Sequence, residues 1–230
     1  MLDGPHREED GAMTMDVDFT AQRVPGRGLD LYDLGLKRAL DLALVALVAP
    51  FVAVVVALLA LLVAADGGAP FYAQWRVGRS GRLFRMWKLR TMVVGADAAL
   101  AAHLDADPAA RAEWDAFQKL ERDPRVTPLG RILRRLSLDE LPQLWNVLTG
   151  DMSLVGPRPM MPSQRGDYPG RAYYALRPGL TGAWQVSARN ESTFAERARF
   201  DGAYAAALSL WTDLAILAAT VGVVLRATGR

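Results

Sequence analysis

The longest hydrophobic stretch of the chain runs from Leu42 to Ala65 and contains no charged or strongly polar side chain. It is longer than the roughly 20 residues that a helix needs to cross the hydrocarbon core of a bilayer. Pro50 lies inside it, and a proline removes a backbone hydrogen bond and bends a helix. The pattern therefore predicts a membrane helix with a bend near Pro50.

Basic residues flank this stretch on both sides, and they bear on how the helix meets the membrane. Lys37 and Arg38 precede it, and a longer set follows it: Arg76, Arg79, Arg82, Arg85, Lys88 and Arg90. Basic flanks prefer the cytoplasmic side, so the charge bias favours a re-entrant helix that enters, bends and returns to the same face. A simple transmembrane span stays open as the alternative.

The pattern that follows predicts a mixture of helices and short strands. Apolar and basic residues interleave over 71–79 and 83–90, and the glycine-bounded segment between them indicates a hairpin turn. Residues 93–122 are rich in alanine and predict a helix. Another helix is expected to begin at Pro128, with Thr127 as its N-cap.

The C-terminal part of the chain continues this pattern. Residues 153–155 predict a short strand, and 177–186 predict a second turn followed by a strand. From Asp201 to Arg226 the spacing is helical, but the continuous apolar part, 214–225, is too short to cross a bilayer. This amphipathic helix is expected to pack in the core or to lie in the membrane interface.

Composition excludes several kinds of chemistry. The chain has 230 residues and no cysteine, which excludes disulfides, cysteine-liganded zinc and thiol nucleophiles. Its two histidines, His6 and His103, are far apart in the sequence and do not suggest histidine acid–base or metal chemistry. The net charge of +2 does not indicate a nucleic-acid-binding protein.

The most informative polar positions lie in the stretch SLDELPQLWN, which begins at Ser137. Ser137 and Glu140 have the spacing of a capping box, which would place Asp139 and Glu140 in the first turn of a helix. The positive end of a helix favours ionised carboxylates and bound phosphate. Asp139 is therefore a candidate carboxylate nucleophile for phosphoryl transfer. The alternative is that both residues only favour the start of a helix.

Several arginines are expected near this acidic pair. Arg131, Arg134 and Arg135 share one face of the helix that begins at Pro128, and that helix ends where the acidic pair begins. Arg158 lies between two prolines in a stiff turn, so it loses little backbone entropy when it binds. These cations could hold a polyphosphate near the carboxylates. Simple ion pairing is the alternative.

Two other patterns are weaker. Asp105 and Asp107 form a D-x-D triplet, with which nucleotide-sugar glycosyltransferases hold a metal. The triplet is short and common, and Pro108 follows it, so a solvated loop is expected. The segment 78–81 lacks the spacing of a phosphate-binding P-loop.

Four motifs occur in a fixed order: KRALDLAL at 37–44, FRMWKLRTM at 84–92, SLDELPQLWNVLTGDMSLVGPRP at 137–159 and RPGLTGAWQV at 177–186. Over roughly residues 33–228 the chain resembles the bacterial sugar transferase family, the monotopic phosphoglycosyl transferases. That family includes undecaprenyl-phosphate galactose and glucose phosphotransferases. This chain departs from the family pattern at Ala49-Pro50, where the family has a Ser-Pro pair. The bend of the helix would therefore rest on Pro50 and the flanking charges.

The resemblance implies a reaction and roles for the candidate residues. A UDP-sugar would give its sugar-1-phosphate to undecaprenyl phosphate, with release of UMP. Asp139 would be the nucleophile that forms a phosphosugar-aspartate intermediate. Glu140 would be its partner, which helps to bind Mg²⁺ or assists the second attack. The basic positions that would support catalysis or hold phosphate are Lys88, Arg134, Arg158, Arg90 and Arg189.

The residue pattern and the resemblance together predict an organisation and a location. The fold class is α+β and mostly helical, with a flexible tail (1–30), a re-entrant membrane helix (31–66), a catalytic domain (67–200) and a C-terminal amphipathic helix (201–230). The enzyme would work at the cytoplasmic face of the bacterial inner membrane, in contact with lipid and without nucleic acid. The sequence identifies neither the sugar nor the polysaccharide, and it leaves a homodimer open.

Two alternatives of other kinds remain. One is a non-catalytic scaffold at the membrane surface. The other is a metal-dependent glycosyltransferase that would use Asp105 and Asp107 and release UDP.

Overall fold

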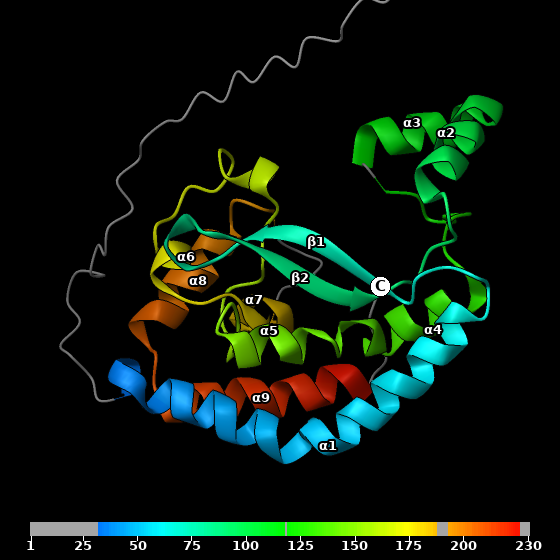
Figure 1. The fold of residues 1–230 in the computed structure, drawn as a ribbon. Helices are drawn as coiled ribbons and strands as arrows, with labels where there is room; N and C mark the ends of the chain where they lie inside the picture. The colour runs from blue at the N-terminus through cyan, green and yellow to red at the C-terminus, as the bar shows by residue number, and fades with distance from the viewer. Residues whose placement is uncertain (1–31, 118, 188–192, 226–230) are drawn as a thin grey trace, which may run out of the picture.

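The structure, a computed structural model, describes residues 32–117, 119–187 and 193–225 (Figure 1). The tail predicted over residues 1–30 and the candidate Arg189 lie outside the described residues.

Helices make up most of the described chain, and two pairs of short strands complete it. The α-helices are α1 (Lys37–Ala64), α2 (Ala96–Ala106), α3 (Pro108–Phe117), α4 (Pro128–Arg135), α5 (Gln143–Thr149), α6 (Ala172–Ala175), α7 (Ala183–Ser187), α8 (Arg197–Ala206) and α9 (Leu210–Leu225). The strands are β1 (Phe71–Val77), β2 (Leu83–Leu89), β3 (Ser153–Val155) and β4 (Gly179–Thr181). A π-helical turn, η1 (Tyr32–Leu36), and three 3-10 turns, η2 (Arg79–Gly81), η3 (Leu138–Glu140) and η4 (Pro162–Gln164), connect them. The predicted fold class, mostly helical with a few short strands, is confirmed.

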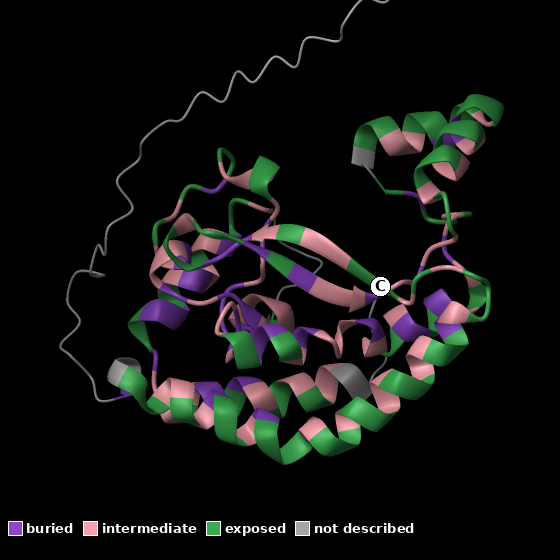
Figure 2. Cartoon of the chain, in the orientation of Figure 1, coloured by how far each residue is buried: buried purple, intermediate pink, exposed green. Residues whose placement is uncertain are grey.

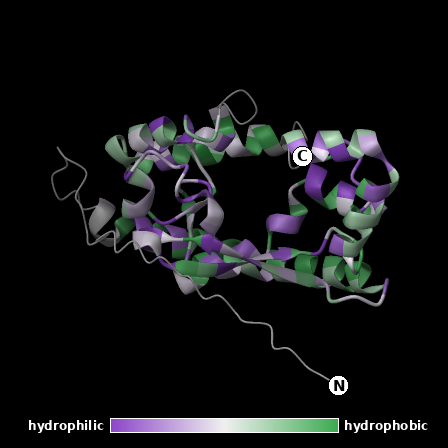
Figure 3. Cartoon of the chain, turned by 90° about the horizontal axis from the view of Figure 1, so that it is seen from above, coloured by the Kyte–Doolittle hydropathy of each residue, from purple (hydrophilic) through white to green (hydrophobic). Residues whose placement is uncertain are grey.

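Helix α1 is long and apolar enough to cross a membrane, and most of its apolar stretch is exposed (Figures 2 and 3). Leu47, Phe51 and Leu61 expose 77%, 75% and 71% of their surface. Figure 1 shows that α1 curves along its length, and Pro50 lies within it. A single side of α1 contacts the rest of the protein, which leaves a large apolar surface for another environment.

The first turns of α1 hold it to the body of the protein. Asp41 is buried, and its carboxylate accepts a hydrogen bond of 3.1 Å from the backbone N–H of Leu154. One turn further, Val45 is fully buried against Phe84 and Val147. The part of α1 before Pro50 is therefore anchored by a buried carboxylate and by apolar packing.

Strands β1 and β2 form the predicted hairpin, in an antiparallel register that pairs Phe71 with Leu89 and Val77 with Leu83. Its turn contains two residues with positive φ, Ser80 at 57° and Gly81 at 75°. The hairpin lies above α5 in Figure 1, and the two are joined by Asn146. The amide of Asn146 accepts from the backbone N–H of Trp87 at 3.0 Å and donates to the Arg85 carbonyl at 2.8 Å.

Strands β3 and β4 form a short parallel pair next to the hairpin. The two segments approach so closely that a Cβ on Gly156 would lie 2.3 Å from the Arg177 carbonyl oxygen. A Cβ on Gly182 would lie 2.0 Å from the carbonyl oxygen of Gly156. Glycine is therefore required on both sides of this crossing, which fixes the chain immediately before Arg158.

Two predicted helical segments are each divided into two helices. The helix predicted over 93–122 is interrupted at Asp107, whose carboxylate caps α3 by accepting from the backbone N–H groups of Ala109 and Ala110. The helix predicted from Asp201 to Arg226 is interrupted before Ser209, whose hydroxyl accepts from the N–H of Thr212. In both places a side-chain cap starts a new helix, and this local bond outweighs the helical spacing.

Candidate active site

The acidic pair Asp139–Glu140 lies in the 3-10 turn η3, between α4 and α5. The predicted capping box is wrong. Ser137 has φ 57°, makes no side-chain capping bond, and donates its own N–H to the Arg134 carbonyl at the end of α4. The serine thus helps to close the preceding helix, and the positive end of an α-helix does not account for the placement of the two carboxylates.

Lys88 on β2 contacts both carboxylates of the pair. Its ammonium group lies 2.8 Å from Glu140 Oε1 and 3.5 Å from Asp139 Oδ2. Asp139 exposes only 6% of its surface, and Glu140 is partly exposed. The structure therefore brings together the three residues expected to be catalytic, with the buried carboxylate innermost.

Burial raises the pKa of Asp139 above its ordinary value. The positive charge of Lys88 opposes that rise, the negative charge of Glu140 adds to it, and the charge of Arg134 opposes it. A carboxylate whose pKa is set by burial and by specific charged partners is a candidate functional group.

Arg134 reaches the same region from α4, and the start of that helix is built as predicted. Thr127 caps α4 by accepting from the N–H of Gly130 at 2.8 Å, and Pro128 is the first helical residue. Arg134 Nε donates to the Thr91 hydroxyl at 2.9 Å, just after the end of β2. The capped helix therefore fixes the guanidinium of Arg134 close to the acidic pair.

Arg158 lies in a second cationic cluster, with Arg76 of β1 and Arg197 of α8. Arg197 donates to the backbone carbonyl of Arg158, and its guanidinium stacks on the rings of Trp184 and Phe194. Burial lowers the pKa of Arg76, and the charge of Arg158 lowers it further. Within the described ranges no carboxylate forms an ion pair with Arg76, Arg158 or Arg197, although the charge of Asp201 acts on Arg197. The cluster therefore keeps positive charge that suits an anionic ligand.

The remaining basic candidate, Arg90, is fully engaged at the end of α1. It pairs with Asp66 at 2.5 Å and donates to the carbonyls of Val63, Ala69 and Met92 at 2.7–3.0 Å. The hydrogen bonds from Arg90 lower the pKa of Asp66 to about 2. Arg90 thus ties the C-terminal end of α1 to β2, and its role in phosphate binding stays a prediction.

The sequence motifs predict no role for Arg197, and they include Arg76 only as part of a basic flank. For Arg76 a signal existed, because it follows Trp75 in a segment where aromatic and basic residues interleave. Arg197 follows no motif, and only the folded chain brings it to Arg158. In the D-x-D triplet, Asp107 caps α3 and Asp105 pairs with Arg111 at 2.7 Å, so both carboxylates have structural partners.

The acidic pair can be tested for its fit to Mg²⁺. Within the described residues no group of three or more His, Cys, Asp or Glu side chains could hold a metal ion. Mg²⁺ is often held by one or two carboxylates together with waters and substrate phosphates. Asp139 and Glu140 fit that kind of site, in which the substrate completes the coordination.

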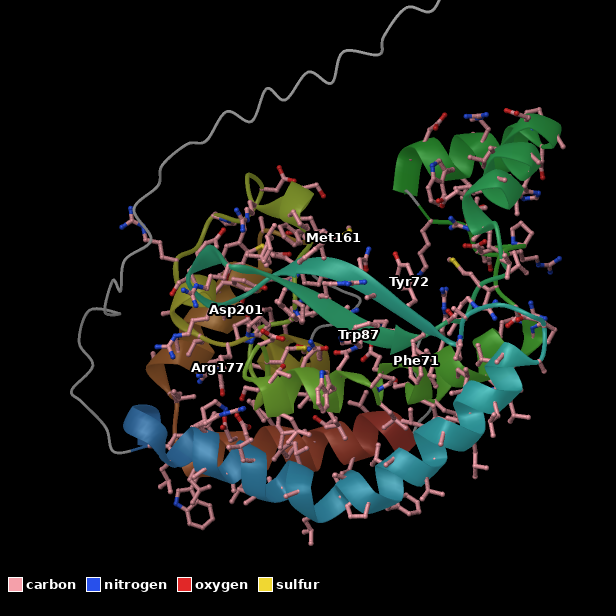
Figure 4. The ribbon with its side chains drawn as sticks, in the orientation of Figure 1. Phe71, Tyr72, Trp87, Met161, Arg177 and Asp201 are labelled. Atoms are coloured by element: carbon pink, nitrogen blue, oxygen red, sulfur yellow. The ribbon has the colours of Figure 1, made fainter. Side chains whose placement is uncertain are left out.

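An apolar cavity of about 400 Å³ lies between the hairpin, α5 and the middle of α1. Figure 4 labels two of its lining residues, Phe71 and Trp87, on the hairpin. Ala49, Val52 and Ala53 line it from α1, around the position of Pro50. Leu141 also lines it and directly follows Glu140, so the cavity adjoins the acidic pair.

Comparisons with known proteins agree on one family. The family model described as "Bacterial sugar transferase" matches residues 32–227. The UDP-galactose-lipid carrier transferase of Erwinia amylovora is 47% identical over 84% of this chain and 41% of its own length. The undecaprenyl-phosphate galactose phosphotransferase of Salmonella typhimurium is 50% identical over 71% of this chain and 35% of its own length. The exopolysaccharide production protein ExoY of Sinorhizobium fredii is 43% identical over 84% of this chain and 87% of its own length. The chain therefore spans less than half the length of the first two relatives and most of the third.

Proposed function

The chain belongs to the bacterial sugar transferase family, and from this premise we propose that it transfers a hexose-1-phosphate from a UDP-sugar to undecaprenyl phosphate. The names of two relatives state a UDP-sugar donor and an undecaprenyl-phosphate acceptor. A third relative is named for exopolysaccharide production, which suggests that the product enters polysaccharide assembly. The observation that carries the proposal is the contact of Lys88 with both Asp139 and Glu140.

The acidic pair would perform the first half of the reaction. A carboxylate oxygen of Asp139 attacks the phosphorus that bears the sugar and forms an acyl phosphate. The bond from that phosphorus to the bridging oxygen breaks, and UMP leaves with the electron pair. Lys88 and Arg134 lie where they can neutralise charge on the phosphoryl oxygens, and Arg158 would supply a third cation.

The second half of the reaction regenerates the enzyme. A phosphate oxygen of undecaprenyl phosphate attacks the same phosphorus, and the bond to Asp139 breaks to restore the carboxylate. The product is a sugar linked to the lipid through a diphosphate. Mg²⁺, when bound by Asp139 and Glu140, would supply further charge neutralisation for the donor phosphates.

The acceptor explains the apolar surfaces. A polyprenyl chain is confined to the bilayer, so the site must lie at the level of the lipid phosphates. The exposed apolar surface of α1 supports membrane insertion, and the curvature of α1 supports the re-entrant geometry. The apolar cavity next to Glu140 would receive the first isoprene units. We place the enzyme at the cytoplasmic face of the inner membrane, where UDP-sugars are available.

The decisive experiment measures the nucleotide released from a panel of UDP-sugars in the presence of undecaprenyl phosphate and Mg²⁺. The native protein is compared with Asp139→Asn and with the control Asp167→Asn, which changes an exposed aspartate. UMP from one donor, lost in Asp139→Asn and retained in Asp167→Asn, is the expected result. It would also identify the sugar.

Two other outcomes would contradict the proposal. Release of UDP would indicate a glycosyltransferase that transfers the sugar without its phosphate. If no nucleotide is released, a search by mass spectrometry for a phosphosugar adduct on Asp139 follows. Its absence with every donor would favour a scaffold.

A further inference from the structure

A second pocket, of about 600 Å³, lies at the opposite end of the hairpin from Lys88. Its lining comes from the hairpin tip, from the turn after α5 and from the segment before β4: Gly78, Arg79, Ser80, Arg82, Leu83, Phe84, Gly150, Asp151 and Arg177. Leu83 and Lys88 are five residues apart on β2, which corresponds to roughly 17 Å along a strand. The pocket is therefore distinct from the acidic pair.

Four guanidinium groups gather around this pocket. Arg79, Arg82 and Arg177 line it, and a Cβ on Gly150 would lie 3.7 Å from the guanidinium of Arg38. No carboxylate ion pair involves any of these four arginines in the part of the chain that the structure describes. The positive charge of the pocket is thus left for a ligand.

Internal hydrogen bonds hold the inner arginines but do not neutralise them. Arg38 donates to the carbonyls of Val147 and Leu148 at 2.6 and 3.1 Å, and Arg177 Nε donates to the Gly150 carbonyl at 3.0 Å. Burial lowers the pKa of Arg177, the charges of Arg79 and Arg38 lower it further, and the charge of Asp41 opposes this effect. Such crowding of like charges is relieved when an anion binds.

The lining also contains one acidic residue, Asp151, so the arginines around the pocket leave a net positive charge. The carboxylate of Asp151 accepts hydrogen bonds from the side chains of Asn146 and Thr149, at 3.3 and 3.0 Å.

Hydrogen bonds to backbone carbonyl groups hold the hairpin tip in place. The N–H of Gly78 donates to the Arg82 carbonyl at 2.6 Å, and Arg165 donates to the Gly81 carbonyl. Arg79 and Arg82 are exposed on this fixed turn. The two arginines can therefore bind without a large loss of backbone entropy.

Apolar side chains adjoin the cations. Leu83, within the lining, is 50% exposed, and Leu148, whose carbonyl accepts from Arg38, is 39% exposed. Arg38 itself lies at the start of α1, directly before the apolar part of that helix. Basic residues at the end of a membrane helix lie at the level of the lipid headgroups. A free nucleotide would gain nothing from the apolar rim, whereas a lipid would.

We propose that this pocket binds the phosphate group of an anionic membrane lipid, with Arg79, Arg82 and Arg177 around the phosphate and Leu83 against the start of the acyl chains. This second site goes beyond the proposed transferase reaction and does not depend on it. It would fix the hairpin at the membrane surface at the end remote from Lys88.

The test is a lipid titration followed by native mass spectrometry of the full chain in detergent. Phosphatidylglycerol and phosphatidylcholine with the same acyl chains are compared. The variant is Arg79→Gln with Arg82→Gln. The control is Arg111→Gln with Arg122→Gln, which removes the same charge from exposed positions on and after α3. UMP binding is measured in parallel by calorimetry, and thermal unfolding checks that both variants are folded.

We expect the native protein and the control to prefer phosphatidylglycerol for the first bound lipid. In the Arg79/Arg82 variant this binding should weaken by about 10- to 30-fold, since each basic residue near an anionic lipid surface is worth roughly a factor of five. UMP binding should be unchanged.

Three outcomes would overturn the proposal. The native protein could lack a preference for phosphatidylglycerol, or the variant could retain it. Alternatively, the variant could lose UMP binding while its lipid binding is unchanged, which would make the pocket a nucleotide phosphate site. None of these readouts requires transferase activity, so the lipid site and the reaction can fail separately.

Discussion

Lys88 Nζ lies 2.8 Å from Glu140 Oε1, although the two residues are 52 positions apart in the chain. The strand β2 supplies the cation and the turn η3 supplies the carboxylates. Glu140 holds the ammonium group in place, and the same group lies 3.5 Å from the buried Asp139. Lys88 therefore supports the ionised form of the proposed nucleophile.

Substitution of Lys88 by methionine should raise the pKa of Asp139, because Lys88 is the main influence that opposes the effect of burial. Fewer Asp139 side chains are then ionised at a given pH. We expect the acid limb of the pH–rate profile for UMP release to move to higher pH. At neutral pH, kcat/KM should fall by about 100-fold or more, as for the loss of one electrostatic contact in an active site.

The control for this prediction is Lys88→Arg, which keeps the positive charge. It should leave the acid limb closer to its native position than Lys88→Met does. An acid limb that does not move in Lys88→Met would show that Lys88 does not act through the ionisation of Asp139.

The contact between Lys88 and Glu140 also marks the limit of what the sequence predicts. The hairpin, the α4 cap at Thr127 and the long apolar helix depend on neighbouring residues, and the structure confirms all three. The capping box predicted at Ser137 also depended on neighbouring residues, but it does not form. The N–H of Ser137 instead donates to the carbonyl of Arg134 at the end of α4.

Contacts between distant segments left no local signal. The position of Lys88 relative to the acidic pair followed only from resemblance to a family, and its geometry required the folded chain. Arg197 shows the same limit more strongly, because nothing near it in the sequence indicates that it meets Arg158. The caps at Asp107 and Ser209, by contrast, are local features. Asp107 directly precedes a proline, which is a signal for the start of a helix.

Asp201 should make stability depend on pH. Burial raises the pKa of its carboxyl to about 6, while the hydrogen bond from Tyr168 and the charge of Arg197 only partly oppose this effect. Because the folded state holds this proton more tightly than the unfolded state, Asp201 stabilises the fold fully below about pH 4. That contribution is lost as the pH rises through about 6.

The measurement compares thermal unfolding of the native protein and Asp201→Asn from pH 4 to pH 7. Asparagine keeps an acceptor for the 2.7 Å hydrogen bond from Tyr168 but cannot ionise. Relative to the variant, the native protein should lose about 3 kcal/mol at most over this range. Parallel curves would contradict the raised pKa.

Gly150 is required by the backbone where α5 ends. Its φ is +91°, in the left-handed region, and the guanidinium of Arg38 lies next to it. Gly150→Ala should lower the free energy of unfolding by about 1–2 kcal/mol, because a Cβ is unfavourable in this conformation. The matched control is Gly202→Ala, within α8, where nothing lies within 4 Å of a new Cβ.

For that control we expect the opposite sign, a gain of about 0.5–1 kcal/mol, because alanine favours a helix more than glycine does. Denaturant unfolding of the two purified variants in detergent measures both effects. Equal changes in the two variants would rule out the conformational explanation.

The last prediction concerns the apolar cavity beside Glu140. Ala53 lines it from α1, whereas its neighbour Val54 is 59% exposed and does not line it. Ala53→Phe should fill part of the cavity and raise the KM for undecaprenyl phosphate by roughly tenfold, because about 1–2 kcal/mol of apolar contact is lost. The first half-reaction, measured as a burst of UMP without acceptor, should be unchanged. Val54→Phe adds the same ring on the outer side of α1 and should leave both quantities at their native values. If Ala53→Phe slows the burst of UMP and leaves the KM for the acceptor unchanged, the cavity serves the donor side of the site and the isoprene chain binds elsewhere.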